Sequence, residues 1–217
     1  MMVPVVSIVG LSGSGKTTLL EKVITELKKR GYRVAALKHD AHGFEIDYEG
    51  KDSFRHGKAG ASAIALSSPR KFAVIKKVAK EWPPERLISS FLADADVVIT
   101  EGYKKGRFPK IEVVRKGVSA APVASVKDGL IAVASDMRIK AGVPVYGIDD
   151  FRSIASLIER EIIRKHVRKT VSLVVDGRDV ELKPFIEDLM REAVFGMVRS
   201  LKGCKNPGEI NLKARKR

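Results

Sequence analysis

The start of the chain combines a predicted β-strand, a glycine-rich loop and a helix, and this order constrains the fold more than any other feature. Residues 5–9 form a short apolar, β-branched run, as expected of a buried strand. The loop 10–17 has the pattern G-x-x-x-x-G-K-T, and apolar residues recur at helical spacing over 17–29. A strand, a glycine-rich loop and a helix in this order are typical of a phosphate-binding loop, so the sequence predicts an α/β fold.

The loop also predicts a site for a nucleoside triphosphate with Mg²⁺. Glycines allow successive backbone N–H groups to converge on phosphate oxygens, and the helix N-terminus adds partial positive charge. Lys16 is expected to reach the outer phosphates. The hydroxyl of Thr17 is expected to help hold Mg²⁺.

Strand and helix patterns alternate along the next part of the chain. Strands are expected at 33–37, 61–66, 72–75, 97–99, 111–114, 130–133 and 143–146. Helices are expected at 52–59, from Pro83 or Pro84 to Leu92, and at 151–165 after an Asp149 or Asp150 cap. This alternation predicts a mainly parallel sheet with helices on both faces, in a P-loop domain spanning residues 1–168.

The pattern changes near residue 170. Residues 171–175 and 178–182 flank Asp176-Gly177, which is a strong signal for a hairpin with a primed two-residue turn. A helix is expected from Pro184 to about Leu201, followed by a short strand at 209–212. We therefore predict a small basic C-terminal extension, residues 169–217, with a ββα(β) arrangement.

Composition narrows the partners and the location. Of the 217 residues, 41 are Lys or Arg and 26 are Asp or Glu, and the net charge of +15 favours anionic ligands. Aromatic residues are few and do not alternate with basic ones, so nucleic acid is not the expected partner of the main domain, although RNA binding by the extension stays open. The single cysteine fits a reducing, cytoplasmic location, and no signal peptide or membrane span is predicted.

Three acidic residues follow predicted strands, where ligands of parallel sheets gather. Glu101 is the candidate catalytic residue and Mg²⁺ ligand, because an acid at the end of strand 97–99 can orient the metal shell or a water molecule. Asp40 could contact the nucleotide or could be an ordinary surface residue, and the sequence favours neither. Asp136 is a possible acceptor for the base edge, but a surface capping role is favoured. His39 and His42 beside Asp40 suggest phosphate or loop contacts rather than a zinc site.

Five segments together resemble the MobB family of molybdopterin-guanine dinucleotide biosynthesis adaptor proteins. They are Gly10–Thr17, Lys38–Asp47, Gly50–His56 with the following Ala59–Ala61, Val98–Lys104 and Pro109–Glu112. Their order and spacing match over roughly residues 3–165.

The resemblance implies a homodimer that binds GTP with Mg²⁺ and hydrolyses it weakly. It also implies that the protein assists the guanylyltransferase that attaches GMP to molybdopterin. Glu101 would lie near Mg²⁺. By motif position the phosphate contacts would be Gly13, Gly15, Lys16, Thr17 and Thr18, and the rest of the predicted nucleotide-binding set is Gly10, Ser12, Ser14, Asp40 and Asp136.

Two other functions use the same loop. A small-molecule kinase would need an acceptor pocket and an arginine-bearing lid, for which Arg107 and Arg115 are present without a compact lid signature. A metal-insertion GTPase would need a cysteine and histidine cluster, which the sequence does not show. Arg55 or Arg107 could act as an arginine finger only across a dimer.

Overall fold

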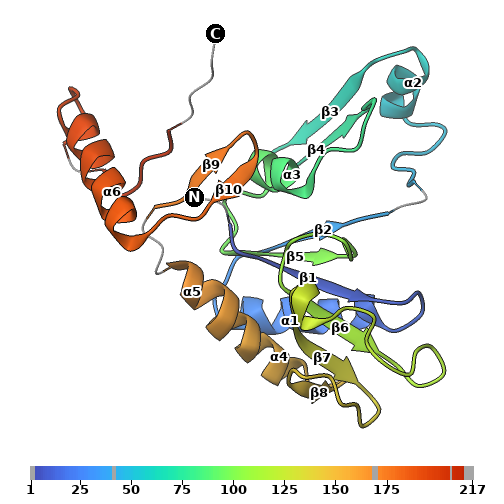
Figure 1. Ribbon diagram of the computed structural model, residues 1–217. Helices are drawn as coiled ribbons and strands as arrows, with labels where there is room; N and C mark the ends of the chain where they lie inside the picture. The colour runs from blue at the N-terminus through green and yellow to red at the C-terminus, as the bar shows by residue number, and fades with distance from the viewer. Residues whose placement is uncertain (1–2, 41–42, 168–170, 206, 213–217) are drawn as a thin grey trace.

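A six-stranded parallel sheet forms the centre of the computed structural model, which describes residues 3–40, 43–167, 171–205 and 207–212 (Figure 1). The strand order is β2-β5-β1-β6-β7-β8. The strands are β1 (Val5–Gly10), β2 (Val34–Lys38), β5 (Val97–Glu101), β6 (Lys110–Val114), β7 (Leu130–Ser135) and β8 (Val145–Gly147). The predicted α/β class and parallel sheet are confirmed.

Strand β1 lies inside the sheet, so the loop that follows it opens at the carboxyl edge. It pairs in parallel with β5 on one side, where Ile8 is in register with Glu101. On the other side it pairs with β6, where Gly10 is in register with Val113. Val6 and Ile8 are completely buried, which explains the apolar pattern of this strand.

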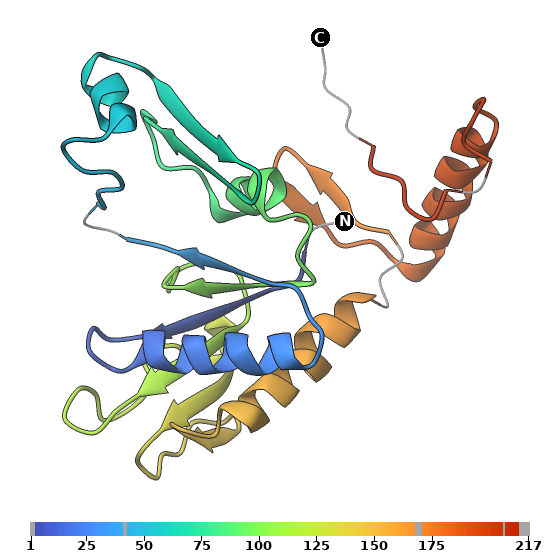
Figure 2. The same cartoon turned by 180° about the vertical axis from the view of Figure 1, so that it is seen from behind.

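One face of the sheet is covered by α1 (Lys16–Lys29) and α4 (Phe151–Ile158), which pack side by side (Figure 2). A π-helical turn (Glu159–Ile163) continues α4 into α5 (Arg164–Val167). Asp150 caps α4 by accepting a hydrogen bond from the backbone N–H of Ser153 at 3.2 Å, as predicted. The core between this layer and the sheet contains Leu19, Val23, Leu27, Ile154 and Ile158.

The other face is covered by α3 (Pro84–Phe91) and by loops. Ile88 of α3 is buried against Val3 and Val98. Farther along, Val114, Leu130 and Val133 pack under the loop after β7, and a short 3₁₀ helix (Val126–Asp128) precedes that strand. Both faces are therefore covered, but helices dominate only one of them.

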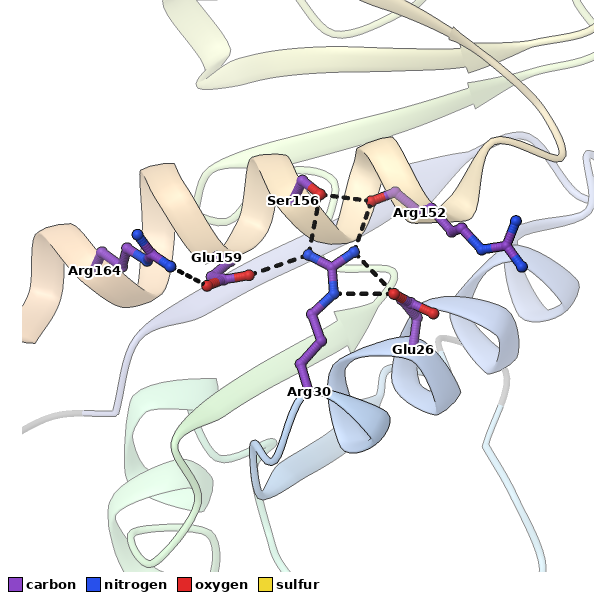
Figure 3. Close-up of polar contacts among 6 residues, drawn as sticks. All are labelled: Glu26, Arg30, Arg152, Ser156, Glu159 and Arg164. Atoms are coloured by element: carbon purple, nitrogen blue, oxygen red, sulfur yellow. Dashed lines mark hydrogen bonds and ion pairs between the residues drawn. The ribbon is translucent and has the colours of Figure 1, made fainter.

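Arg30 fastens the end of α1 to α4 (Figure 3). Its Nε and Nη2 donate to a carboxylate oxygen of Glu26 at 3.0 and 2.9 Å. Its Nη1 donates to the hydroxyl of Ser156 at 3.0 Å and to Glu159 at 3.1 Å, and its Nη2 also donates to the carbonyl of Arg152 at 3.1 Å. The planar guanidinium thereby fixes the relative position of the two helices.

Helix α2 (Asp52–Lys58) and the strands β3 (Ala63–Ser68) and β4 (Lys71–Lys76) form an arm that stands apart from the sheet (Figures 1 and 2). Both strands were predicted, but they pair antiparallel with each other and do not join the parallel sheet. A two-residue turn connects them, and such a turn can only join antiparallel neighbours. Leu66, Phe72 and Val74 of the arm are exposed.

The C-terminal unit contains β9 (Leu173–Val175), β10 (Arg178–Val180) and α6 (Pro184–Arg199). Asp176 and Gly177 adopt φ values of 50° and 77°, as a primed turn requires, so the predicted hairpin is confirmed. The strand predicted at 209–212 is wrong, because these residues have no regular secondary structure and do not join the β9–β10 pair. Ile210 instead lines a cavity of about 230 Å³ beside α6.

Candidate functional site: a phosphate loop at the carboxyl edge of the sheet

The loop between β1 and α1 forms an open cradle. Gly13 and Gly15 have φ values of 75° and 93°, in the left-handed region that favours glycine. Among the described residues, no atom lies within 4 Å of the place where a Cβ of Gly13 would be, so they leave this side of the loop open. Gly15 is the N-cap of α1, which points the positive end of the helix dipole at the cradle.

Gly10 and Ser14 lie on the inner side of the loop and do not face the cradle. A Cβ on Gly10 would lie 2.6 Å from the carbonyl oxygen of Val113, so glycine is required there by the close approach of β6. The Ser14 side chain is fully buried, and its Oγ has no hydrogen-bond partner among the described residues. Ser12 and Thr18 are exposed beside the cradle. Any contact of Ser14 with a phosphate would therefore use its backbone.

The ammonium group of Lys16 contacts the backbone of the phosphate loop. Its Nζ donates to the carbonyl oxygen of Leu11 at 2.7 Å. Partial burial lowers the pKa of Lys16 below its ordinary value; the nearby Glu101 acts against this shift, and Lys38 and Lys104 add to it. A partly desolvated ammonium among other cations interacts strongly with an incoming polyanion.

Thr17 and Glu101, the two candidate Mg²⁺ ligands, are in contact. The Thr17 hydroxyl is 3.1 and 3.2 Å from the two carboxylate oxygens of Glu101, at the end of β5. A hydroxyl and a carboxylate are hard oxygen donors, which Mg²⁺ prefers. The donor set at this edge therefore fits a nucleotide-bound Mg²⁺, with Thr17 and Glu101 as the residues that would hold it.

His39 supports this pair from the end of β2. Its backbone N–H donates to the carbonyl oxygen of Glu101 at 2.9 Å. Its ring lies 4.7 Å from the ring of Tyr103, and its Nε2 is 3.1 Å from a carboxylate oxygen of Glu81. Asp40 is exposed next to it, and His42 lies outside the described residues. These contacts give His39 a positioning role at the end of β5.

Arg115 reaches the phosphate loop from the other side, a placement that the sequence analysis did not predict. It is the first residue after β6, and its Nη1 lies 3.4 Å from the place of a Gly15 Cβ. Asp136, the first residue after β7, lies 4.0 Å from the Arg115 Nε and accepts the backbone N–H of Lys116 at 2.9 Å. Applying the strand-end rule to basic residues would have singled out Arg115.

The other predicted arginines lie elsewhere. Arg107 lines a cavity of about 560 Å³ at the amino edge of the sheet, together with Val3 and Pro4. It is therefore excluded as an arginine finger for the phosphate loop of its own chain. Arg55 pairs with Asp52 at 3.7 Å within α2 of the arm.

Comparison with known proteins identifies the family of this chain. The family model "Molybdopterin guanine dinucleotide synthesis protein B" (MobB) matches residues 5–136. A molybdopterin-guanine dinucleotide biosynthesis adapter protein of Haemophilus influenzae is 34% identical over 165 residues, which are 76% of this chain and 92% of that protein. A relative from Methanocaldococcus jannaschii is 26% identical over 232 residues, with 96% of both chains covered.

Solved structures show the same fold. A crystal structure of molybdopterin-guanine biosynthesis protein B has 32% sequence identity and a TM-score of 0.58, covering 72% of this chain and 97% of its own. The structure of Bacillus subtilis MobB has 26% identity and a TM-score of 0.58, covering 73% and 98%. The chain thus belongs to the MobB family of molybdopterin-guanine dinucleotide biosynthesis adapter proteins.

Proposed function

We propose that this MobB protein binds GTP with Mg²⁺ at the phosphate loop and assists the attachment of GMP to molybdopterin. The observation that carries the proposal is the open cradle between Gly13 and Gly15, with Lys16 at its rim and the Thr17–Glu101 pair beside it. These parts supply N–H donors, a cation and metal ligands, which are what a triphosphate with its metal needs.

Each residue has a separate part in this binding. Backbone N–H groups at the start of α1 would hold phosphate oxygens, and Lys16 would exchange the Leu11 carbonyl for a phosphate. A bound Mg²⁺ would neutralise phosphate charge and polarise the outer phosphorus. Glu101 is already engaged with Thr17, so it is poorly placed to activate a water molecule as well. We therefore propose at most weak GTP hydrolysis.

The charge of the chain supports a second anionic partner. Lys38 and Lys104 lie close enough to Lys16 to lower its pKa, so several cations gather at this edge. With a net charge of +15, the protein would attract both GTP and the phosphate of molybdopterin. We propose that molybdopterin and the guanylyltransferase are the partners, as the printed names of the relatives suggest.

We also propose a homodimer, which the family resemblance implies. The arm is the surface expected to be buried, because Leu66, Phe72 and Val74 are exposed on it. Phe72→Asp is expected to weaken self-association in analytical ultracentrifugation, since a charge in a buried apolar interface is costly. Lys71→Asp at the exposed start of β4 is a matched control, and an equal effect of both variants on self-association would contradict this surface.

We also propose that the protein is located in the cytoplasm. Among the described residues, no helix has the length and apolar content needed to cross a membrane. The single cysteine, Cys204, is not in a disulfide. Subcellular fractionation with an antibody to the chain tests this location.

Calorimetry with a nucleotide panel tests the proposed site. We expect GTP with Mg²⁺ to bind more tightly than ATP, and Lys16→Ala to weaken binding by about 100-fold, the value of one charge-assisted contact. Lys22→Ala, which removes an exposed lysine paired with Asp149, is the matched control on the same helix. Unchanged GTP affinity in Lys16→Ala, with the fold intact by circular dichroism, would refute the phosphate assignment. Phosphate transfer to a pterin or nucleoside would favour a kinase.

A further inference from the structure

Helix α6 of the C-terminal unit carries an exposed apolar stripe. Phe185, Leu189, Ala193 and Met197 follow each other at every fourth position of the helix, and Leu201 comes at the same spacing just after the helix ends at Arg199. The four large side chains are 72, 56, 61 and 58% exposed in chain order. Residues four apart form a continuous ridge on a helix, so these side chains make one surface and are not scattered.

The stripe is not the inward face of the helix. Met190, Val194 and Phe195 line the small cavity that α6 shares with Leu173 and Ile210. In Figure 1, α6 forms the outer border of the C-terminal unit, with β9, β10 and the following chain on one side of it. Within the described part of the chain, the large side chains of the stripe thus stay in contact with solvent.

The stripe is self-complementary. Two large apolar residues precede Ala193 and two follow it at equal spacing. A two-fold axis at Ala193 would place Leu189 of one chain against Met197 of another, and Phe185 near Leu201 just beyond the end of the other helix. We propose that α6 pairs antiparallel with α6 of a second copy of this chain, in an isologous contact centred on Ala193.

Size and charge agree with this pairing. Ala193 and the neighbouring Gly196, whose Cβ position has no atom within 4 Å, allow two helices to approach closely at the crossing point. Acidic residues lie in the first half of the exposed edge, where Asp188 and Glu192 share Arg191. Arg199 lies in the second half, and Lys202 follows just beyond the helix. An antiparallel arrangement brings the acidic half of each helix to the basic half of the other.

Cysteine crosslinking of the full-length chain tests the contact. Facing Cα atoms on the axis of two crossing helices lie about 5 Å apart, which suits a disulfide. In a Cys204→Ser background, Ala193→Cys is expected to give a covalent dimer on mild oxidation. Arg199→Cys, on the charged edge of α6, is the matched control and is expected to stay uncrosslinked.

Two further substitutions, each added to Ala193→Cys, distinguish the α6 contact from other contacts between chains. Adding Leu189→Asp is expected to abolish the crosslink of Ala193→Cys, with an unchanged melting temperature because Leu189 is exposed. Adding Phe72→Asp, which affects only the arm, is expected to leave the crosslink in place. Equal crosslinking at 193 and 199, no crosslink at 193, or binding of the stripe to anionic lipid vesicles in place of a second chain overturns the proposal. None of these results depends on whether the protein binds GTP.

Discussion

Substitution of Glu101 should reduce GTP hydrolysis much more than GTP binding. Its carboxylate contacts the Thr17 hydroxyl, while the cradle of backbone N–H groups lies elsewhere in the loop. Glu101→Gln keeps the size but removes the charge, so Mg²⁺-dependent GTP hydrolysis is expected to fall about 10–100-fold, with a much smaller change in GTP affinity. Phosphate release and calorimetry measure the two effects. An equal loss of both would indicate a structural role for Glu101.

Arg115 should contribute to affinity through its charge. Because its Nη1 lies beside Gly15, Arg115→Ala is expected to weaken GTP binding about 3–10-fold, as suits a half-exposed cation, and added salt should reduce the difference. Arg115→Lys should restore part of the affinity. Arg107→Ala, at the opposite edge of the sheet, should bind GTP like the native chain. The idea fails if Arg107→Ala and Arg115→Ala have the same affinity.

At the scale of elements, the contact between α1 and α4 depends on Arg30. Lysine cannot reproduce its forked contacts, so Arg30→Lys is expected to lower the free energy of unfolding by about 1–2 kcal/mol in urea titrations. The matched control is Arg33→Lys, whose pair with Asp96 is more exposed. A stability loss no greater than that of this control would contradict the role of Arg30.

The contact between α1 and α4 also makes the stability of the protein depend on pH. Hydrogen bonds from Arg164, and also from Arg30 and Tyr32, hold the pKa of Glu159 below its ordinary value despite partial burial. A carboxyl with a lowered pKa in the folded state stabilises the protein above its unfolded pKa, and this stabilisation is lost as pH falls through the folded pKa. The stability difference between the native chain and Glu159→Gln should therefore shrink on acidification. A constant difference from neutral to acidic pH would contradict this.

At the scale of the whole molecule, we predict two units that join near residue 168. The phosphate loop lies at the carboxyl edge, whereas the C-terminal unit faces the amino edge across the cavity lined by Val3 and Leu173. A chain ending at Val167 is expected to fold cooperatively and keep its GTP affinity. The Haemophilus influenzae relative, which the match covers almost completely, aligns with only 76% of this chain. Loss of GTP binding on truncation would show that the two units depend on each other.

The sequence alone determined the features that depend on neighbouring residues. The glycines of the phosphate loop, the Asp176-Gly177 turn and the Asp150 cap all act within a few residues, so their patterns predicted the observed geometry. The pairing of Thr17 with Glu101 was also predictable, because strand ends in a parallel sheet share one edge.

Only the tertiary structure decided which distant residues meet. Arg115 and Arg107 looked equivalent in the sequence, but the order of strands places one beside Gly15 and the other at the opposite edge. Likewise, β3 and β4 pair with each other outside the main sheet, and this depends on which strands form hydrogen bonds with one another. Such choices depend on contacts between segments far apart in the chain, which local periodicity does not encode.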